Sequence, residues 1–178
     1  MNLIEFYNYT QNKSDKEIYH KYITNFYNQK FEKFKNKKIS ILEIGIQYGN
    51  SLKLWDGFFT DAKIYAIDIS RYYIHTYSQN VNIIIGDAYK QDAINYFNSL
   101  DIKFDIIIDD GPHTLSSQDF FLTNYPKLLK DKDSIIILED IYDNAFPFLK
   151  MKYDDFTCLD FADQIGGERN SRIMFKEK

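Results

Sequence analysis

The chain has 178 residues, of which 44% are hydrophobic and 17% aromatic, so it is long enough to bury the core of one domain. Its net charge of -4 at pH 7 disfavours nucleic-acid binding, which requires a basic surface. The single cysteine, Cys158, cannot form an internal disulfide, and we expect a cytoplasmic protein with neither a signal peptide nor a membrane span.

The first long element expected along the chain is a helix. Ser14 is a good N-cap residue, Glu17 lies near the capping-box position, and apolar residues recur at helical spacing as far as about Phe34. We therefore predict one continuous helix over this stretch, with His20 on its surface. His75 is likewise expected on the surface of a helix.

Beyond residue 38, short continuous apolar runs alternate with helical stretches. Such runs lack in–out alternation, as do the strands of a parallel sheet that helices cover on both faces. This order predicts an α/β fold with a doubly wound, mainly parallel sheet. The expected strands span 39–45, 63–68, 82–87, 104–110 and 134–140, and the expected helices 51–59, 91–100 and 116–129. An antiparallel hairpin of 155–161 and 171–175, joined at Gly166-Gly167, should close the sheet.

Every expected parallel strand ends on an acidic residue, at the sheet edge where such folds bind ligands. The first loop, Glu43-x-Gly45-x-x-x-Gly49, allows close approach of the backbone but lacks the glycine pattern of a dinucleotide site, which favours a ligand without phosphates. Asp68 is placed to bind ribose hydroxyls, and Asp87 to meet an adenine amino group. The alternative is a glycine-rich turn with two capping acids.

A second acidic group, Asp110, Glu139 and Asp140, ends two strands that should be adjacent. These carboxylates would repel one another unless a cation lies among them, and oxygen ligands favour Mg²⁺, Mn²⁺ or Ca²⁺. His113 follows Asp110 after a Gly-Pro turn and could accept a proton at neutral pH. The alternative is that the acids serve as turn and cap residues and that the histidine is solvated.

The chain resembles, over nearly its whole length, the macrocin and mycinamicin type of sugar O-methyltransferases, which have the Rossmann-like class I fold that binds S-adenosylmethionine. The matching residues are Ser14-Asp15-Lys16, His20, Tyr22, Leu42-Glu43-Ile44-Gly45, Ser51-Leu52-x-x-Trp55, Phe59, Ile64–Ile69, and, most specifically, Ile108–His113 and Leu138-Glu139-Asp140. We therefore expect one methyltransferase domain over 1–178, with an N-terminal helical segment at 1–37 and the Rossmann-like core at 38–178.

The resemblance implies Mg²⁺ or Mn²⁺ held by Asp110, Glu139 and Asp140, with His113 as general base. It implies methylation of a hydroxyl on a small-molecule or glycan acceptor, such as a sugar or glycoside in carbohydrate biosynthesis. The residues expected to bind S-adenosylmethionine are Glu43, Gly45, Gly49, Ser51, Asp68, Ile69, Gly86, Asp87, Ala88 and Asp109.

The chain departs from the family pattern in three places. Pro112 replaces the usual Ser, Gln47 fills the middle of the glycine-rich loop, and little sequence lies between Asp140 and the hairpin to cover an acceptor. A partner subunit in a homo-oligomer is one way to complete that side of the site. Three alternatives stay open: a catechol or phenolic-diol O-methyltransferase, a related antibiotic hydroxylase, and a non-catalytic module that binds a nucleoside ligand.

Overall fold

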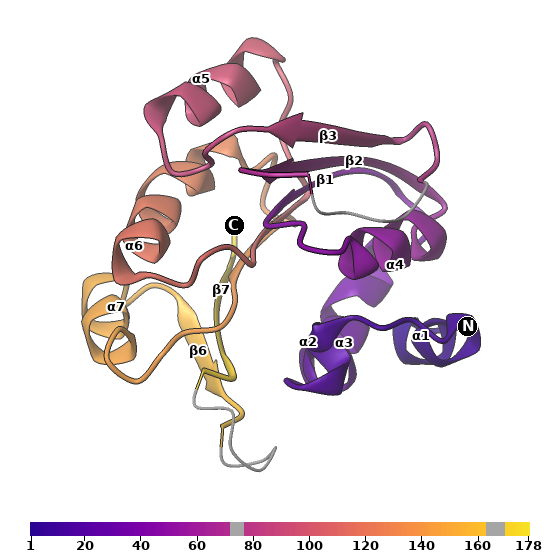
Figure 1. Cartoon of the computed structure of the whole chain (residues 1–178), viewed down its shortest axis with the longest axis horizontal. Helices are drawn as coiled ribbons and strands as arrows, with labels where there is room; N and C mark the ends of the chain where they lie inside the picture. Colours follow the sequence, from indigo (N-terminus) through magenta and orange to yellow (C-terminus); the bar gives the residue numbers. More distant parts are fainter. Residues whose placement is uncertain (72–76, 163–169) are drawn as a thin grey trace.

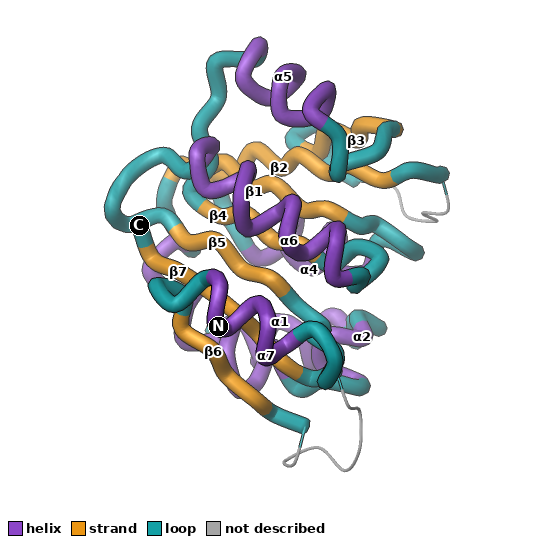
Figure 2. The backbone as a smooth tube through the Cα atoms, turned by 90° about the vertical axis from the view of Figure 1, so that its left-hand side faces the viewer, coloured by secondary structure: helices purple, strands orange, loops and turns teal. Residues whose placement is uncertain are grey.

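The computed structural model describes residues 1–71, 77–162 and 170–178. Within these ranges the chain forms a mixed sheet in the order β3-β2-β1-β4-β5-β7-β6 (Figure 2). The strands are β1 (Lys38–Ile44), β2 (Asp61–Asp68), β3 (Val81–Ile85), β4 (Ile106–Asp109), β5 (Ile135–Leu138), β6 (Thr157–Asp160) and β7 (Arg172–Glu177).

The first five strands are parallel, and β7 runs antiparallel to both β5 and β6. The register pairs Ile44 of β1 with Ile67 of β2 and with Asp109 of β4, so the loops that follow these strands open at one edge. The predicted doubly wound sheet and its antiparallel C-terminal hairpin are confirmed. The expected Gly166-Gly167 turn lies outside the described residues.

Helices cover both faces of the sheet, as Figure 1 shows. One face packs against α1 (Leu3–Thr10), α4 (Asn50–Phe58) and the helical segments that precede β1. The other face packs against α5 (Gln91–Ser99), α6 (Leu115–Asn124), a 3-10 turn (Tyr125–Leu128) and α7 (Phe146–Lys152). Successive β1 residues alternate between the two cores, with Ile41 in one and Leu42 in the other. None of the helices in the described ranges is both long and apolar enough to cross a membrane.

The predicted continuous helix before β1 is wrong in its continuity. It consists of α2 (Asp15–Ile18), a π-helical turn (Ile23–Tyr27), α3 (Asn28–Phe31) and a 3-10 turn (Glu32–Phe34). The first break falls at Lys21, whose φ is +55°. Ser14 is the N-cap residue but its side chain makes no capping bond, and Glu17 instead accepts hydrogen bonds from the backbone and hydroxyl of Thr24.

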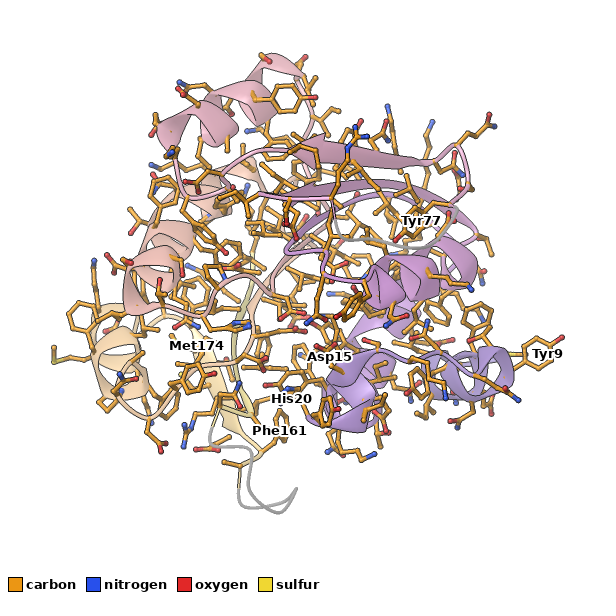
Figure 3. The ribbon with its side chains drawn as sticks, in the orientation of Figure 1. Tyr9, Asp15, His20, Tyr77, Phe161 and Met174 are labelled. Atoms are coloured by element: carbon orange, nitrogen blue, oxygen red, sulfur yellow. The ribbon has the colours of Figure 1, made fainter. Side chains whose placement is uncertain are left out.

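His20 lies in this break and is buried, so its predicted place on a helix surface is also wrong. Its Nδ1 lies 2.9 Å from the Ser171 hydroxyl, and its ring stacks on Tyr22. Figure 3 shows His20 on the side of the N-terminal segment that faces Phe161, while Tyr9 points away from the body of the molecule. Contacts with the C-terminal hairpin thus override the local helical periodicity. His75 lies outside the described residues.

Candidate functional site

A cavity of about 1120 Å³ opens at the carboxyl ends of β1 to β4. The sequence-predicted ligand-binding residues that line it are Gly45, Gly49, Ser51, Asp68, Ile69, Gly86, Asp87 and Ala88. Asp110 and His113 line it as well. Its lining combines acids with apolar side chains such as Ile67 and Phe120, which suits a ligand that carries both apolar and hydrogen-bonding groups.

The loop after β1 is held in place by Asp68, from the end of β2. One carboxylate oxygen of Asp68 accepts hydrogen bonds from the backbone of Ile46 at 2.7 Å and of Gln47 at 3.3 Å. Its other oxygen accepts from the backbone of Ser70 at 2.9 Å. Asp68 therefore fixes the glycine-rich loop as well as facing the cavity.

Gly45 occupies a position that no other residue fits. Its φ is +86°, and an added Cβ would lie 2.0 Å from the backbone oxygen of Asp110. The close approach brings the β1 loop against the β4 loop, and so joins the glycine-rich loop to the acidic cluster.

We expect Gly45→Ala to destabilise the protein by more than about 2 kcal/mol, because left-handed backbone and a collision with backbone add together. Urea unfolding with and without the substitution measures this. The matched control is Gly86→Ala, whose added Cβ would make only an ordinary contact of 3.8 Å with Ile67. Equal stability of the two variants would contradict this assignment of Gly45.

Two of the expected ligand-binding acids lie behind the cavity. Glu43 is fully buried and accepts a hydrogen bond of 3.0 Å from the Trp55 indole, and burial raises its pKa to about 7. Asp109 is also buried, and the Tyr89 hydroxyl donates to it at 2.5 Å. Burial raises the pKa of Asp109 to about 7. Tyr89 itself lines the cavity, so Asp109 reaches it through this tyrosine.

Asp110, His113 and Asp140 form a compact group at the far end of the cavity. Each offers one ligand atom, and these atoms all lie within 4.8 Å of one another. His113 Nε2 lies 3.7 Å from Asp110 Oδ1 and 3.8 Å from Asp140 Oδ2. The other oxygen of each acid has a protein partner, because Lys16 contacts Asp110 Oδ2 at 2.5 Å and the Tyr22 hydroxyl donates to Asp140 Oδ1 at 2.7 Å. Each acid thus turns one oxygen toward His113.

The backbone at this group is strained, because His113 and Asp140 both have φ of +55°. Neighbouring residues hold the two conformations. The Gln118 amide, from α6, donates to the carbonyls of Glu139 and Asp140 at 3.3 and 3.2 Å. Thr114, directly after His113, caps α6 by accepting from the backbone of Ser117. The positions of both side chains are therefore fixed by the packing of α6.

The charges of this group are unevenly distributed. Burial and the neighbouring Asp110 raise the pKa of Asp140 to about 8. Burial acts to raise the pKa of Asp110, but Lys16, His113 and His20 together outweigh it and the net direction is downward. Burial lowers the pKa of His113 below its usual 6.5. The imidazole is therefore neutral at pH 7 and able to accept a proton.

Glu139, the third expected metal ligand, is buried in protein contacts. Lys16 Nζ contacts one of its oxygens, and the Tyr27 hydroxyl donates to the other. Burial raises the pKa of Glu139 well above its usual value. The structure therefore brings Asp110 and Asp140 together with His113, and places Glu139 on the inner side of the cluster.

Four residues before β1 complete the cluster, and they were not predicted as site residues: Lys16, His20, Tyr22 and Tyr27. His20 Nε2 lies 3.6 Å from Asp140 Oδ2, and the other three contact the acids as described above. The signal that could have found three of them is the Ser14-Asp15-Lys16, His20 and Tyr22 stretch of the family resemblance. Tyr27 carries no sequence signal beyond its apolar periodicity.

A second cavity, of about 530 Å³, adjoins His113. Its lining residues are His113, Thr114, Leu115, Tyr142, Asp143 and Asn144. Arg172 of β7 fixes the loop that forms one side, since its guanidinium donates to the Ile141 carbonyl at 3.2 Å and pairs with Asp143 at 2.7 Å. His113 is thus shared by both cavities.

Known proteins with similar sequences are O-methyltransferases that act on sugars. The chain is 28% identical over 152 residues to 8-demethyl-8-alpha-L-rhamnosyl tetracenomycin-C 2'-O-methyltransferase from Streptomyces olivaceus, covering 81% of this chain and 39% of that protein. It is 32% identical over 99 residues to demethylmacrocin O-methyltransferase from Streptomyces fradiae, covering 52% of this chain and 25% of that protein. The chain therefore spans less than half the length of these relatives. No family model matches it.

Among solved structures, the MycE methyltransferase from the mycinamycin biosynthetic pathway, in complex with Mg and SAH, is similar to the whole chain. The TM-score is 0.76 at 22% sequence identity, and the match covers 100% of this chain and 55% of that one. The fold is thus the Rossmann-like fold of class I methyltransferases, as predicted. The predicted resemblance to the macrocin and mycinamicin type of sugar O-methyltransferases is confirmed by the relatives.

Proposed function

We propose that the chain is an S-adenosylmethionine-dependent O-methyltransferase, assisted by a divalent cation, that acts on a hydroxyl of a sugar or glycoside. The position of His113 carries this proposal. His113 lines both the cavity at the ends of β1 to β4 and the cavity beside Tyr142, so one base is available to a cofactor site and to an acceptor site. The names of the sequence relatives support the sugar acceptor.

The larger cavity fits S-adenosylmethionine or its demethylated product. Gly45 and Gly49 leave room for close approach of the ligand, and Asp68 and Asp87 offer carboxylates to ribose hydroxyls and to an adenine amino group. Glu43 and Asp109 do not line the cavity, and they support it by accepting hydrogen bonds from Trp55 and Tyr89.

We expect Asp68→Ala to weaken cofactor binding by about 1.5–3 kcal/mol, or roughly 10- to 150-fold, because it removes a charged hydrogen-bond acceptor. Calorimetry with S-adenosylmethionine and with its demethylated product measures the loss. Asp92→Ala is the control, since it removes the same charge from an exposed position on α5. Unchanged affinity in Asp68→Ala would remove this residue from the cofactor site.

The acidic group fits a divalent cation. Asp110 and Asp140 each turn one oxygen toward the same space, and ligands of this kind favour Mg²⁺ or Mn²⁺. A buried carboxyl whose pKa is raised by a second acid gains from a nearby cation, which stabilises its ionised form. Both oxygens of Glu139 already have protein partners, Lys16 and Tyr27, so a cation bound by Glu139 would compete with these contacts.

S-adenosylmethionine supplies an electrophilic methyl group, and a bound cation lowers the pKa of an acceptor hydroxyl. The chain itself contributes position and a base. His113 is neutral at pH 7 and takes the hydroxyl proton on Nε2, while α6 and the Asp140 loop fix the site where His113 lines both cavities. Tyr142 and Asn144 offer an aromatic face and an amide to a sugar ring.

Mass spectrometry tests the function directly. The protein is incubated with S-adenosylmethionine and a panel of nucleotide sugars, glycosides and catechols, with and without Mg²⁺. We expect a glycoside to gain the mass of one CH₂ unit in the presence of Mg²⁺, because a methyl group replaces the hydroxyl hydrogen. Methylation of catechols alone would show that the acceptor is a phenol and not a sugar. Tight cofactor binding without turnover on the whole panel would favour a non-catalytic binding module.

A further inference from the structure

Lys16 places a positive charge inside the acidic cluster. Its side chain is almost completely buried, with 1% of its surface exposed, and its ammonium contacts three carboxylates. Asp110 lies at 2.5 Å, Glu43 at 3.5 Å, and Glu139 also in direct contact. Burying a lysine is costly unless its charge is compensated. Here the carboxylates outweigh the effect of burial, so the ammonium stays charged.

Lys16 also performs part of the task of a metal ion. The four acids Glu43, Asp110, Glu139 and Asp140 would repel one another strongly in a buried site. The Lys16 ammonium contacts Glu43, Asp110 and Glu139, and its positive charge offsets one of their negative charges. The hydroxyls of Tyr27 and Tyr22, on the same N-terminal segment, donate to Glu139 and Asp140.

We propose that Lys16 is an internal cation that holds the acidic cluster together without metal and competes electrostatically with the divalent cation. Lys16 shares Asp110 with the proposed cation site, one oxygen each, so its positive charge lies close to any ion bound there. Like charges at this separation repel, and little water intervenes to screen them. The cation should therefore bind weakly and exchange readily, while Asp110 keeps its orientation when the ion leaves. This inference rests on the cation site of the proposed function, but not on methyl transfer.

The test compares Mn²⁺ affinity, followed by electron paramagnetic resonance, in the wild-type protein and in Lys16→Met. Removing the ammonium should tighten Mn²⁺ binding at least about tenfold, because one positive charge no longer opposes the ion. The metal-free variant should also unfold at a lower temperature, and Mn²⁺ should raise its melting temperature more than it raises that of the wild type. Lys16→Arg, which keeps the charge, should keep the weak Mn²⁺ affinity.

Lys53→Met is the matched control, because it removes the same charge from an exposed position on α4. Its Mn²⁺ affinity should equal that of the wild type. Equal or weaker Mn²⁺ binding in Lys16→Met would overturn the proposal and leave Lys16 as a structural residue.

If Lys16→Met does not fold without metal, refolding on addition of Mn²⁺ supports the proposal. Failure of both Lys16→Met and Lys16→Gln to fold at any Mn²⁺ concentration overturns it.

Absence of methyl transfer on every acceptor would refute the proposed function and leave this inference standing, because Mn²⁺ binding is measured without cofactor or acceptor. Conversely, Mn²⁺ affinity that is the same in all variants would refute the role of Lys16 and leave methyl transfer untouched.

Discussion

Substitution of His113 by Ala should lower turnover by about 10²-fold or more, with little change in the affinity for S-adenosylmethionine. His113 lines both cavities, and its Nε2 lies 3.7 Å from Asp110 Oδ1 and 3.8 Å from Asp140 Oδ2. The loss of a general base affects proton removal from the acceptor, whereas the residues that line the cofactor cavity stay in place. Steady-state kinetics and calorimetry on the same preparation separate the two quantities.

The backbone of His113 provides a control for this prediction. Its φ of +55° suits Asn better than Ala, so His113→Asn keeps the loop conformation while removing the base. If proton removal is the function of His113, both variants lose turnover alike. If the loop conformation alone matters, His113→Asn stays active and His113 is not the base.

The pH dependence of the rate follows from the same residue. A base must be neutral to act, and burial lowers the pKa of His113 below its usual 6.5. The rate should therefore rise with pH below about 6.5 and be level at pH 7. At saturating Mg²⁺, which keeps the Asp140 carboxylate ionised, a rise that continues well above pH 7 would contradict His113 as the base.

Removal of divalent cations should abolish turnover, and Mg²⁺ or Mn²⁺ should restore it. One carboxylate oxygen of Asp110 and one of Asp140 lie within 4.8 Å of each other in a largely buried setting, where their repulsion disfavours two ionised carboxylates unless a cation is present. Without the ion, the acceptor hydroxyl loses the group that lowers its pKa. Methyl transfer measured after exhaustive dialysis against a chelator, and again after Mg²⁺ is added, gives the result.

Cofactor affinity measured in the same dialysed sample is the control. It should survive chelation, since Asp68 and the glycine-rich loop are held by hydrogen bonds within the protein. Asp140→Asn should bind Mn²⁺ more weakly than the wild type, while its amide keeps the contact with Tyr22. Full turnover after dialysis would reduce the acidic cluster to a structural role.

The sheet was predictable because each parallel strand is an uninterrupted apolar run, a pattern that burial on both faces requires. The helix before β1 was predicted as one piece because its periodicity is local, whereas the break at Lys21 depends on contacts with distant residues. Helix α7 was not predicted, since seven residues are too few for a helical period to stand out. Pro147, in its first turn, was the available signal.

The site was predictable to the extent that topology determines it. Parallel strands bring their carboxyl ends to one edge, so the acids that follow β1 to β5 were expected together. Their partners were not, because Lys16 contacts Asp110 and Glu139 across 94 and 123 residues of sequence. No local pattern encodes such a pairing, and only the stretch shared with the methyltransferase relatives hinted at it.

The segment before β1 and the hairpin that ends the chain meet beside Asp140. His20 contacts Ser171 across 151 residues of sequence, and the Tyr22 hydroxyl spans 118 residues to reach Asp140. Each of these contacts closes a long loop of chain, and the entropic cost of that closure must be offset by contacts formed elsewhere in the fold. During synthesis, His20 has no Ser171 to meet until the last strand has emerged. A growing chain that has not yet reached Ser171 therefore holds His20, and with it the Asp140 end of the acidic cluster, without this contact.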